Sequence, residues 1–192
     1  MSLSEGERKA LLEIVRSTIE GKLQAGGELC ETPGDSRIPS VLQEKRGVFV
    51  TLKKRGQLRG CIGYIQPFRP LEQAVREMAL AAAFQDPRFS PLSRDELGEI
   101  SVEISVLSPL KRIERPEEIE VGKHGLYIVL GNRSGLLLPQ VATEYGWDAL
   151  TFLEETCYKA GLPNDAWQDE RAAIYAFSAE IIEEPGGMAG PD

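Results

Sequence analysis

Residues 47–65, GVFVTLKKRGQLRGCIGYI, contain two runs that are rich in β-branched and other apolar residues. The runs, 47–52 and 58–65, are separated by the basic segment 53–57, which contains Gly56. Two such runs around a glycine-containing turn predict an antiparallel β-hairpin.

The second run of this hairpin places chemically different side chains on its two faces. Strict alternation predicts that Leu58, Ile62 and Tyr64 share the face that covers the core. It places Arg59 and Cys61 together on the opposite face, with Cα atoms about 6.6 Å apart. A guanidinium at that distance favours the thiolate form of a cysteine. The alternative, which stays open, is an inert and buried Cys61.

Two glycines, Gly60 and Gly63, interrupt the same run. A glycine in a strand lets a ligand or another backbone approach closely. We therefore expect Gly60 and Gly63 to contribute, with Arg59, to a ligand-binding surface around Cys61. A β-bulge is the second interpretation of these glycines.

The remaining pattern predicts further hairpins and several helices. We expect helices from Ser4, where Ser4 and Glu7 form a capping box, and from Pro70, Pro139 and Asp148, a helical turn at 93–96, strands at 100–106, 126–130, 135–138 and 174–182, and a loop at 26–40. In the last strand, Tyr175, Phe177, Ala179 and Ile181 share one face. Strands that come in hairpins rather than in βαβ units indicate an α+β fold, a mostly antiparallel sheet flanked by helices.

The composition is that of a globular protein. The chain has 192 residues, is 42% hydrophobic and carries a formal charge of −8. No apolar run approaches the ~20 residues that a membrane span needs, and the first residues lack the pattern of a signal peptide, so we expect a cytoplasmic protein. Residues 37–77 hold nine basic and three acidic side chains, a local charge of +6. This segment is either a solvated hairpin or an anion site.

Cysteine and histidine usage argues against a metal centre. The three cysteines, Cys30, Cys61 and Cys157, form no Cys-x-x-Cys pair, and His124 is the single histidine. A zinc site needs about four nitrogen or sulfur ligands, so we expect neither a metal nor another cofactor. Free thiols are typical of a reducing compartment.

Several motifs together resemble one protein family. Residues 58–63, LRGCIG, resemble the signature of the AMMECR domain family, and further resemblance lies at 49–52, 86–89, 122–126, 138–142, 146–148 and 159–162. The resemblance implies one domain over 1–183 with two unequal lobes, the larger built from both termini, and we expect a disordered tail at 184–192. It also implies Memo-type and radical-SAM proteins as partners, which would supply any radical chemistry.

Four more matched residues carry reactive or ligand-binding groups. Asp86 could accept a proton and Arg88 could bind a carboxylate or phosphate, or the two could form a pair that pins a turn. His124 could act as the base for a Cys61 nucleophile, or could be a turn histidine without a role. Gln140, at a helix start, could bind a ligand or satisfy that helix end.

These residues support two classes of function. The first is an enzyme or a binding protein for a small anionic ligand, with Cys61 in an arginine-lined cleft and Asp86 and His124 as further catalytic groups. The second is a non-catalytic adaptor that binds a protein partner through anchors such as Phe68 and Arg69. The charge of −8 disfavours a third class, nucleic-acid binding, and no feature indicates a membrane.

Overall fold

The structure, a computed structural model, describes residues 3–24 and 39–184, so Cys30, almost all of the predicted loop 26–40 and the predicted tail beyond Glu184 lie outside the described residues. The chain divides into two compact units, each described by itself below. Unit 1 comprises Met1–Leu107 and Glu180–Asp192, and unit 2 comprises Ser108–Ala179.

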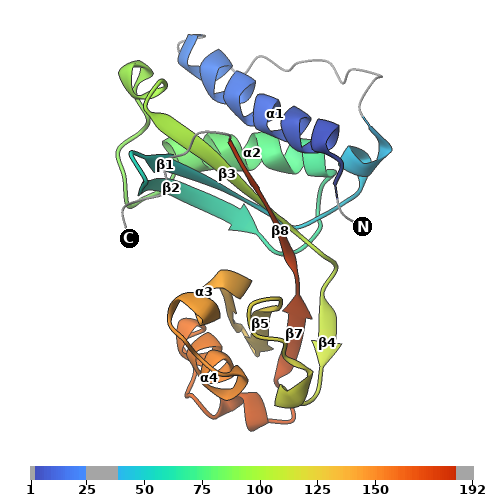
Figure 1. The fold of residues 1–192 in the computed structure, drawn as a ribbon. Helices are drawn as coiled ribbons and strands as arrows, with labels where there is room; N and C mark the ends of the chain where they lie inside the picture. The colour runs from blue at the N-terminus through green and yellow to red at the C-terminus, as the bar shows by residue number, and fades with distance from the viewer. Residues whose placement is uncertain (1–2, 25–38, 185–192) are drawn as a thin grey trace. The chain divides into compact units, whose positions relative to one another are not determined.

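Unit 1 is a four-stranded antiparallel sheet covered by two helices on one face (Figure 1). Its strands are β1 (Val48–Lys54), β2 (Gln57–Tyr64), β3 (Ile100–Leu107) and β8 (Ala179–Glu183), in the order β2-β1-β3-β8. Helices α1 (Glu5–Gln24) and α2 (Leu71–Phe84) and the 3₁₀ turns η1 (Ser40–Gln43) and η2 (Arg94–Glu96) complete the unit. Every second residue of β1, from Val48 to Leu52, is fully buried in the core that α1 and α2 complete.

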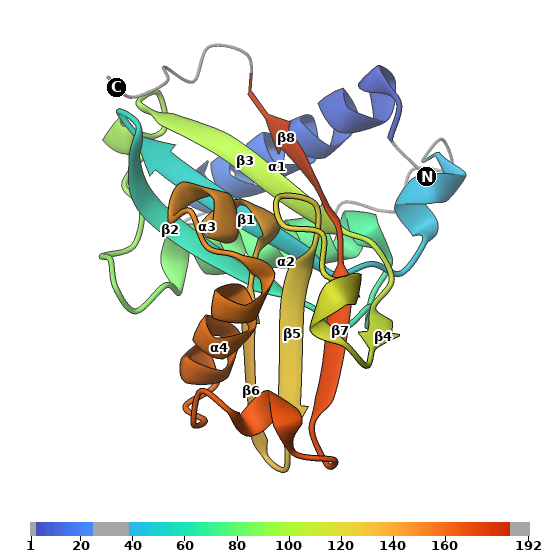
Figure 2. The same ribbon diagram turned by 60° about the horizontal axis from the view of Figure 1, so that its bottom comes forward.

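Unit 2 has the same plan on a smaller scale. Its sheet has the order β4-β7-β5-β6, built from β4 (Lys111–Ile113), β5 (Gly125–Leu130), β6 (Arg133–Leu137) and β7 (Ala173–Phe177). Helices α3 (Pro139–Glu144) and α4 (Ala149–Lys159) and the 3₁₀ turns η3 (Pro116–Glu118) and η4 (Ala166–Gln168) accompany it (Figure 2). Phe152, Leu153 and Cys157 of α4 are buried against this sheet.

The predicted α+β class and the helix starts are confirmed. The side chain of Glu7 accepts from the Ser4 backbone N–H at 2.7 Å, and that of Asp148 accepts from Thr151 N–H at 2.8 Å. Each bond satisfies an N–H group that a helix start leaves without an intrahelical partner. The helices of residues 3–24 and 39–184 are all too short or too polar to span a bilayer.

Two predictions about strands are wrong. The first hairpin turn is tighter than 53–57, because Arg55 and Gly56 both have positive φ, 53° and 79°, and close a two-residue loop. The predicted strand 174–182 is split at Ser178 into β7 and β8, which join different sheets. The four residues predicted to share a face are consequently not equivalent, because Phe177 in β7 is buried whereas Ile181 in β8 is 38% exposed.

The two segments that connect the units are bonded to each other. The backbone N–H of Ser108 donates to the carbonyl oxygen of Ser178 at 2.8 Å, and the Ser178 N–H donates to Ser108 Oγ at 2.9 Å. The chain thus enters unit 2 at Ser108 and leaves it near Ser178, through two backbone segments that lie side by side.

Candidate functional site

A bulge in β2 changes the predicted display of its side chains. Leu52 of β1 opposes Gly60, whereas Lys53 opposes Leu58, so Arg59 has no partner in β1. An extra residue on one strand interrupts the alternation of faces. Leu58, predicted to face the core, is consequently 44% exposed. Beyond the bulge, Ile62 and Tyr64 pack against the core as predicted.

The guanidinium of Arg59 is bound to a carboxylate. Its Nε and Nη2 donate to the two oxygens of Glu96 at 3.0 and 2.9 Å, and Lys54 Nζ lies 3.1 Å from the same group. The hydrogen bonds from Arg59 hold the pKa of Glu96 well below its usual range. Arg59 therefore ties the bulge to η2, a contact that the prediction of a guanidinium displayed beside Cys61 did not include.

Cys61 is half-buried, and its side chain has a partner in the sheet. The hydroxyl of Thr51, directly opposite on β1, donates to the Cys61 sulfur at 3.3 Å. In an antiparallel sheet, side chains lie this close in the non-hydrogen-bonded pairs, in which the backbone N–H and C=O groups of both residues point away from the partner strand. The backbone N–H of Cys61 accordingly points to the free edge of β2, where it donates to Oδ2 of Asp86 at 2.9 Å.

Asp86 and Arg88 form a clamp on that edge. Arg88 Nε and Nη2 donate to the Asp86 carboxylate at 2.9 and 2.7 Å, and Nη2 also donates to the Cys61 carbonyl oxygen at 3.2 Å. The Asp86 side chain is only 2% exposed. Hydrogen bonds from Arg88 hold the pKa of Asp86 far below its usual range, so the group stays ionised at neutral pH. This is the pair that the turn-pinning interpretation expects.

The two glycines of the signature lie where neighbours leave no room for a side chain. A Cβ on Gly60 would collide with the carbonyl oxygen of Ala82 in α2, and one on Gly63 would collide with the ring of Phe49. Gly60 thus permits close packing of another backbone, one of the two uses predicted for it. Gly63 accommodates an aromatic ring from the opposite strand.

The other two predicted site residues belong to unit 2. His124 Nδ1 accepts from the Glu120 backbone N–H at 3.1 Å, within the turn before β5. Gln140 lies in the first turn of the six-residue α3, and its carbonyl oxygen accepts from Thr143 Oγ1 at 2.7 Å. A Cys61–His124 pair stays a prediction, since its members belong to different units.

Two contacts of the site, Thr51 with Cys61 and Glu96 with Arg59, were not foreseen. The register explains the first contact, because Thr51 pairs with Cys61 only once both the two-residue turn and the bulge at Arg59 are known. Within residues 3–24 and 39–184, no group of three or more His, Cys, Asp or Glu side chains is arranged to hold a metal ion.

Known proteins resemble this chain over nearly its whole length. The AMMECR1 family model matches residues 12–182. A protein of Methanothermobacter thermautotrophicus is 48% identical over an alignment of 190 positions, which covers 96% of this chain and 97% of that protein. Protein PF1979 of Pyrococcus furiosus is 49% identical over 91% of this chain and 86% of its own length. The crystal structure of the uncharacterized protein PH0010 from Pyrococcus horikoshii matches with a TM-score of 0.85 and 45% identity, over 95% of this chain and 93% of that one.

Proposed function

The chain belongs to the AMMECR1 family, and we propose that it is a binding protein for a small anionic ligand, with Arg88 as the anion contact beside the thiol of Cys61. The ligand would be a carboxylate or a phosphate, the two groups that a guanidinium binds best.

The exposure and the hydrogen bonds of Arg88 are the observation that supports this proposal. Its side chain is 53% exposed although it bonds both Asp86 and the Cys61 carbonyl. The hydrogen bonds of its guanidinium to the described residues come from Nε and Nη2, so Nη1 stays free to bind a ligand. Since Asp86 and the edge of β2 hold the guanidinium in place, little side-chain entropy would be lost on binding.

The contacts of the other candidates support binding over acid–base catalysis. The Asp86 carboxylate has a strongly lowered pKa and accepts bonds from Arg88 and Cys61, so it is a poor proton acceptor at neutral pH. Arg59 is also bound to a carboxylate, that of Glu96, and its side chain is only 12% exposed, so it is less accessible to a ligand than Arg88. Cys61 then serves as a contact for the ligand, and its thiol as a chemical reporter of the site.

The experiment compares two alkylating reagents at Cys61 in a Cys30→Ser, Cys157→Ser background. Iodoacetate carries a negative charge and iodoacetamide does not, so the ratio of their rates reports an anion site beside the thiol. We expect a ratio about three- to tenfold above that of glutathione, as one nearby positive charge supplies roughly 1 kcal/mol. Arg88→Gln should abolish the excess and Arg88→Lys should keep most of it.

Arg69→Gln is the matched control, because Arg69 is 55% exposed and is likewise paired with one carboxylate, Glu77. It should leave the ratio unchanged. A ratio equal to that of glutathione, or one that Arg88→Gln leaves unaltered, would overturn the proposal.

One observation favours a second candidate function, a protein-interaction adaptor. Phe68, just after β2, is 63% exposed, and its ring packs 5.9 Å from that of Tyr64. Exposed aromatic side chains next to arginine are typical anchors of an interface. The partners to test are a Memo-type and a radical-SAM protein. Phe68→Ala should abolish co-purification, whereas Cys61→Ser should preserve it. Retention by Phe68→Ala would exclude this anchor.

A further inference from the structure

A groove lies beside β8, the strand that ends the sheet of unit 1 on the side away from β2. Its volume is about 460 Å³, within the range of about 300–1,000 Å³ that ligand pockets occupy. One face of α1, from Glu5 to Arg16, and residues 181–184 line the groove. The groove therefore belongs to unit 1 alone, and it shares no residue with the Cys61 site.

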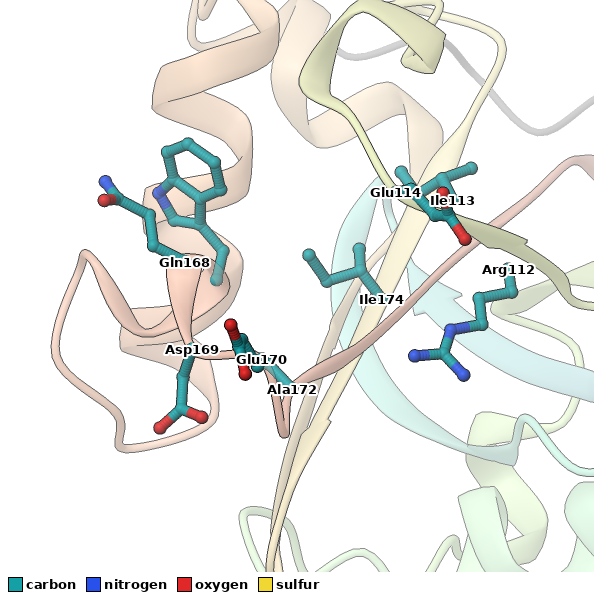
Figure 3. Close-up of a pocket in the computed structure, with 9 residues that line it drawn as sticks. Arg112, Ile113, Glu114, Gln168, Asp169, Glu170, Ala172 and Ile174 are labelled. Carbon is teal, nitrogen blue, oxygen red and sulfur yellow. The ribbon is translucent and has the colours of Figure 1, made fainter.

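Unit 2 has a hollow of its own, of about 550 Å³, which Figure 3 shows. Ile113, Ile174 and the 167–172 segment line it, and Arg112 and Glu170 lie on opposite sides of Ile174. These exposed charges of opposite sign specify no particular ligand. The groove beside β8 differs, because the edge of a strand forms one of its sides.

The outer edge of β8 presents backbone groups to this groove. The Glu184 N–H donates to a carbonyl oxygen of β3 at 3.1 Å, and the bond between Ser108 and Ser178 lies six residues away, at the other end of β8. Backbone groups in an antiparallel strand point to alternate sides, so those of Ile181 and Glu183 point away from β3. No described residue bonds them there. Unlike the edge of β2, which a clamp covers in part, this edge can accept another strand.

Helix α1 runs alongside β8 and forms the opposite wall of the groove. Arg8 bonds Glu180 at 2.7 Å, and Arg16 bonds Glu184 at 2.6 Å. Eight residues of helix and four residues of strand therefore run in the same direction over similar lengths, about 12 and 13 Å. Leu12 lies between the two ion pairs and forms the apolar lining together with the two isoleucines of β8.

The charges that remain around this lining are mostly acidic. Both arginines of the groove are bound to carboxylates, which leaves Glu5, Lys9, Glu13 and Glu183, with a net charge of −2. The Lys9–Glu13 pair is 3.9 Å long and the Lys53–Glu183 pair 3.7 Å long, so neither holds its carboxylate tightly. A second copy of the chain would bring a second acidic rim to this edge, whereas a basic segment would complement it.

We propose that the groove binds an extended, basic segment of another protein, which joins the sheet of unit 1 as a further strand beside β8. Its backbone would bond the edge groups of Ile181 and Glu183, and an apolar side chain at its centre would cover Leu12. Two basic residues four positions apart, about 13 Å in a strand, would face Glu5 and Glu13, which are about 12 Å apart along α1. The ligand class is thus a short strand with an apolar centre and a basic residue at each end.

Calorimetric titration of the full chain with the capped peptide acetyl-Lys-Val-Val-Val-Lys-amide tests the proposal. The peptide should bind, and the same peptide with glutamate in place of both lysines should not. N-methylation of the central valine and N-methylation of the valine before it are matched changes, because neighbouring amides of a strand point to opposite sides. One of them, and only one, should raise the Kd about tenfold by removing a bond to the edge of β8. Equal effects of the two would overturn the addition of a strand.

Glu5→Gln combined with Glu13→Gln should raise the Kd about three- to tenfold, because it removes both exposed partners of the lysines. Glu117→Gln combined with Glu144→Gln is the control, since it changes the net charge equally at exposed sites of unit 2. It should leave the Kd unchanged. Equal losses in the two double variants, or no heat of binding up to about 10 mM peptide, would overturn the proposal.

Sedimentation and truncation identify a different occupant if there is one. The chain should stay monomeric at the concentrations of the titration, and a chain that ends at Glu184 should bind the peptide with the same Kd. A dimer that the peptide dissociates would assign the edge of β8 to a second copy. A markedly lower Kd in the shortened chain would assign the groove to residues 185–192. Either result would overturn the proposal.

Discussion

The backbone N–H of Cys61, in the edge strand β2, donates to the buried carboxylate of Asp86 at 2.9 Å. A residue 25 positions farther along the chain thus supplies the acceptor that a neighbouring strand would otherwise supply. Arg88, bound to that carboxylate, returns a bond to the Cys61 carbonyl. An exposed strand edge invites pairing with other chains, and native proteins commonly cover it. The Asp86–Arg88 clamp covers the edge of β2 at this position.

Asp86→Ala should lower the free energy of unfolding by roughly 3 kcal/mol, because it leaves the Cys61 N–H without an acceptor and Arg88 without its counter-charge. Urea denaturation followed by circular dichroism measures the change. Asp169→Ala is the control. Asp169 and Arg171 repeat the same clamp geometry, but Asp169 is 28% exposed where Asp86 is 2% exposed. Equal losses in the two variants would show that the Cys61 contact contributes nothing.

The clamp also predicts loss of stability in acid. The pKa of Asp86 is lowered in the folded state from an ordinary value of 3.8, chiefly by the Arg88 hydrogen bonds. A lowered folded pKa means that the stabilisation is complete well above the unfolded pKa and is lost as the pH falls below it. The free energy of unfolding, measured from about pH 6 to about pH 2, should fall less steeply in Asp86→Asn than in the parent protein. Parallel curves would contradict the assignment.

Gly60→Ala should be destabilising by about 2 kcal/mol or more, because the new methyl group meets the backbone of α2 at Ala82. The matched control is Gly21→Ala. Gly21 lies within α1 and has open space around its Cα, so alanine there should raise the free energy of unfolding by about 0.5–1 kcal/mol. Thermal melts of the two variants should therefore shift in opposite directions.

Tyr64→Phe should leave stability unchanged or raise it by up to about 1 kcal/mol, since the Tyr64 hydroxyl is buried without a partner among the described residues. Thr156→Val provides the contrast. The Thr156 hydroxyl is also buried but donates to the Phe152 carbonyl at 2.7 Å, so its removal should cost about 1 kcal/mol. A substantial loss in Tyr64→Phe, measured by urea denaturation, would mean that the hydroxyl has a partner.

Features with a local cause could be predicted from the sequence. The capping pairs at Ser4 and Asp148 depend on residues three apart, and the hairpins depend on a short turn between β-rich runs. The break at Ser178 has no such signal, because residues 174–182 are one continuous β-rich run. The position of the break depends on the two sheets, one joined by β7 and the other by β8.

The candidate site shows the same distinction. The signature residues and the 86–88 turn were identified together, and an Asp86–Arg88 pair was one of the two interpretations. A bulge was one of the two interpretations of the glycines, but its position at Arg59 could not be deduced, because strict alternation holds until a partner strand and its register are known. The reason for Gly60 lies in α2, because its Cα packs against the Ala82 backbone more than twenty residues farther along the chain.

The hydrogen bonds between Ser108 and Ser178 make unit 2 an insertion whose first and last residues are joined. Hydrogen bonds hold its two ends together. Between the neighbouring strands β3 and β8, the whole of unit 2 therefore closes the chain as a short loop would. Such an insertion can be excised, exchanged or enlarged during evolution while the strands on either side keep their register.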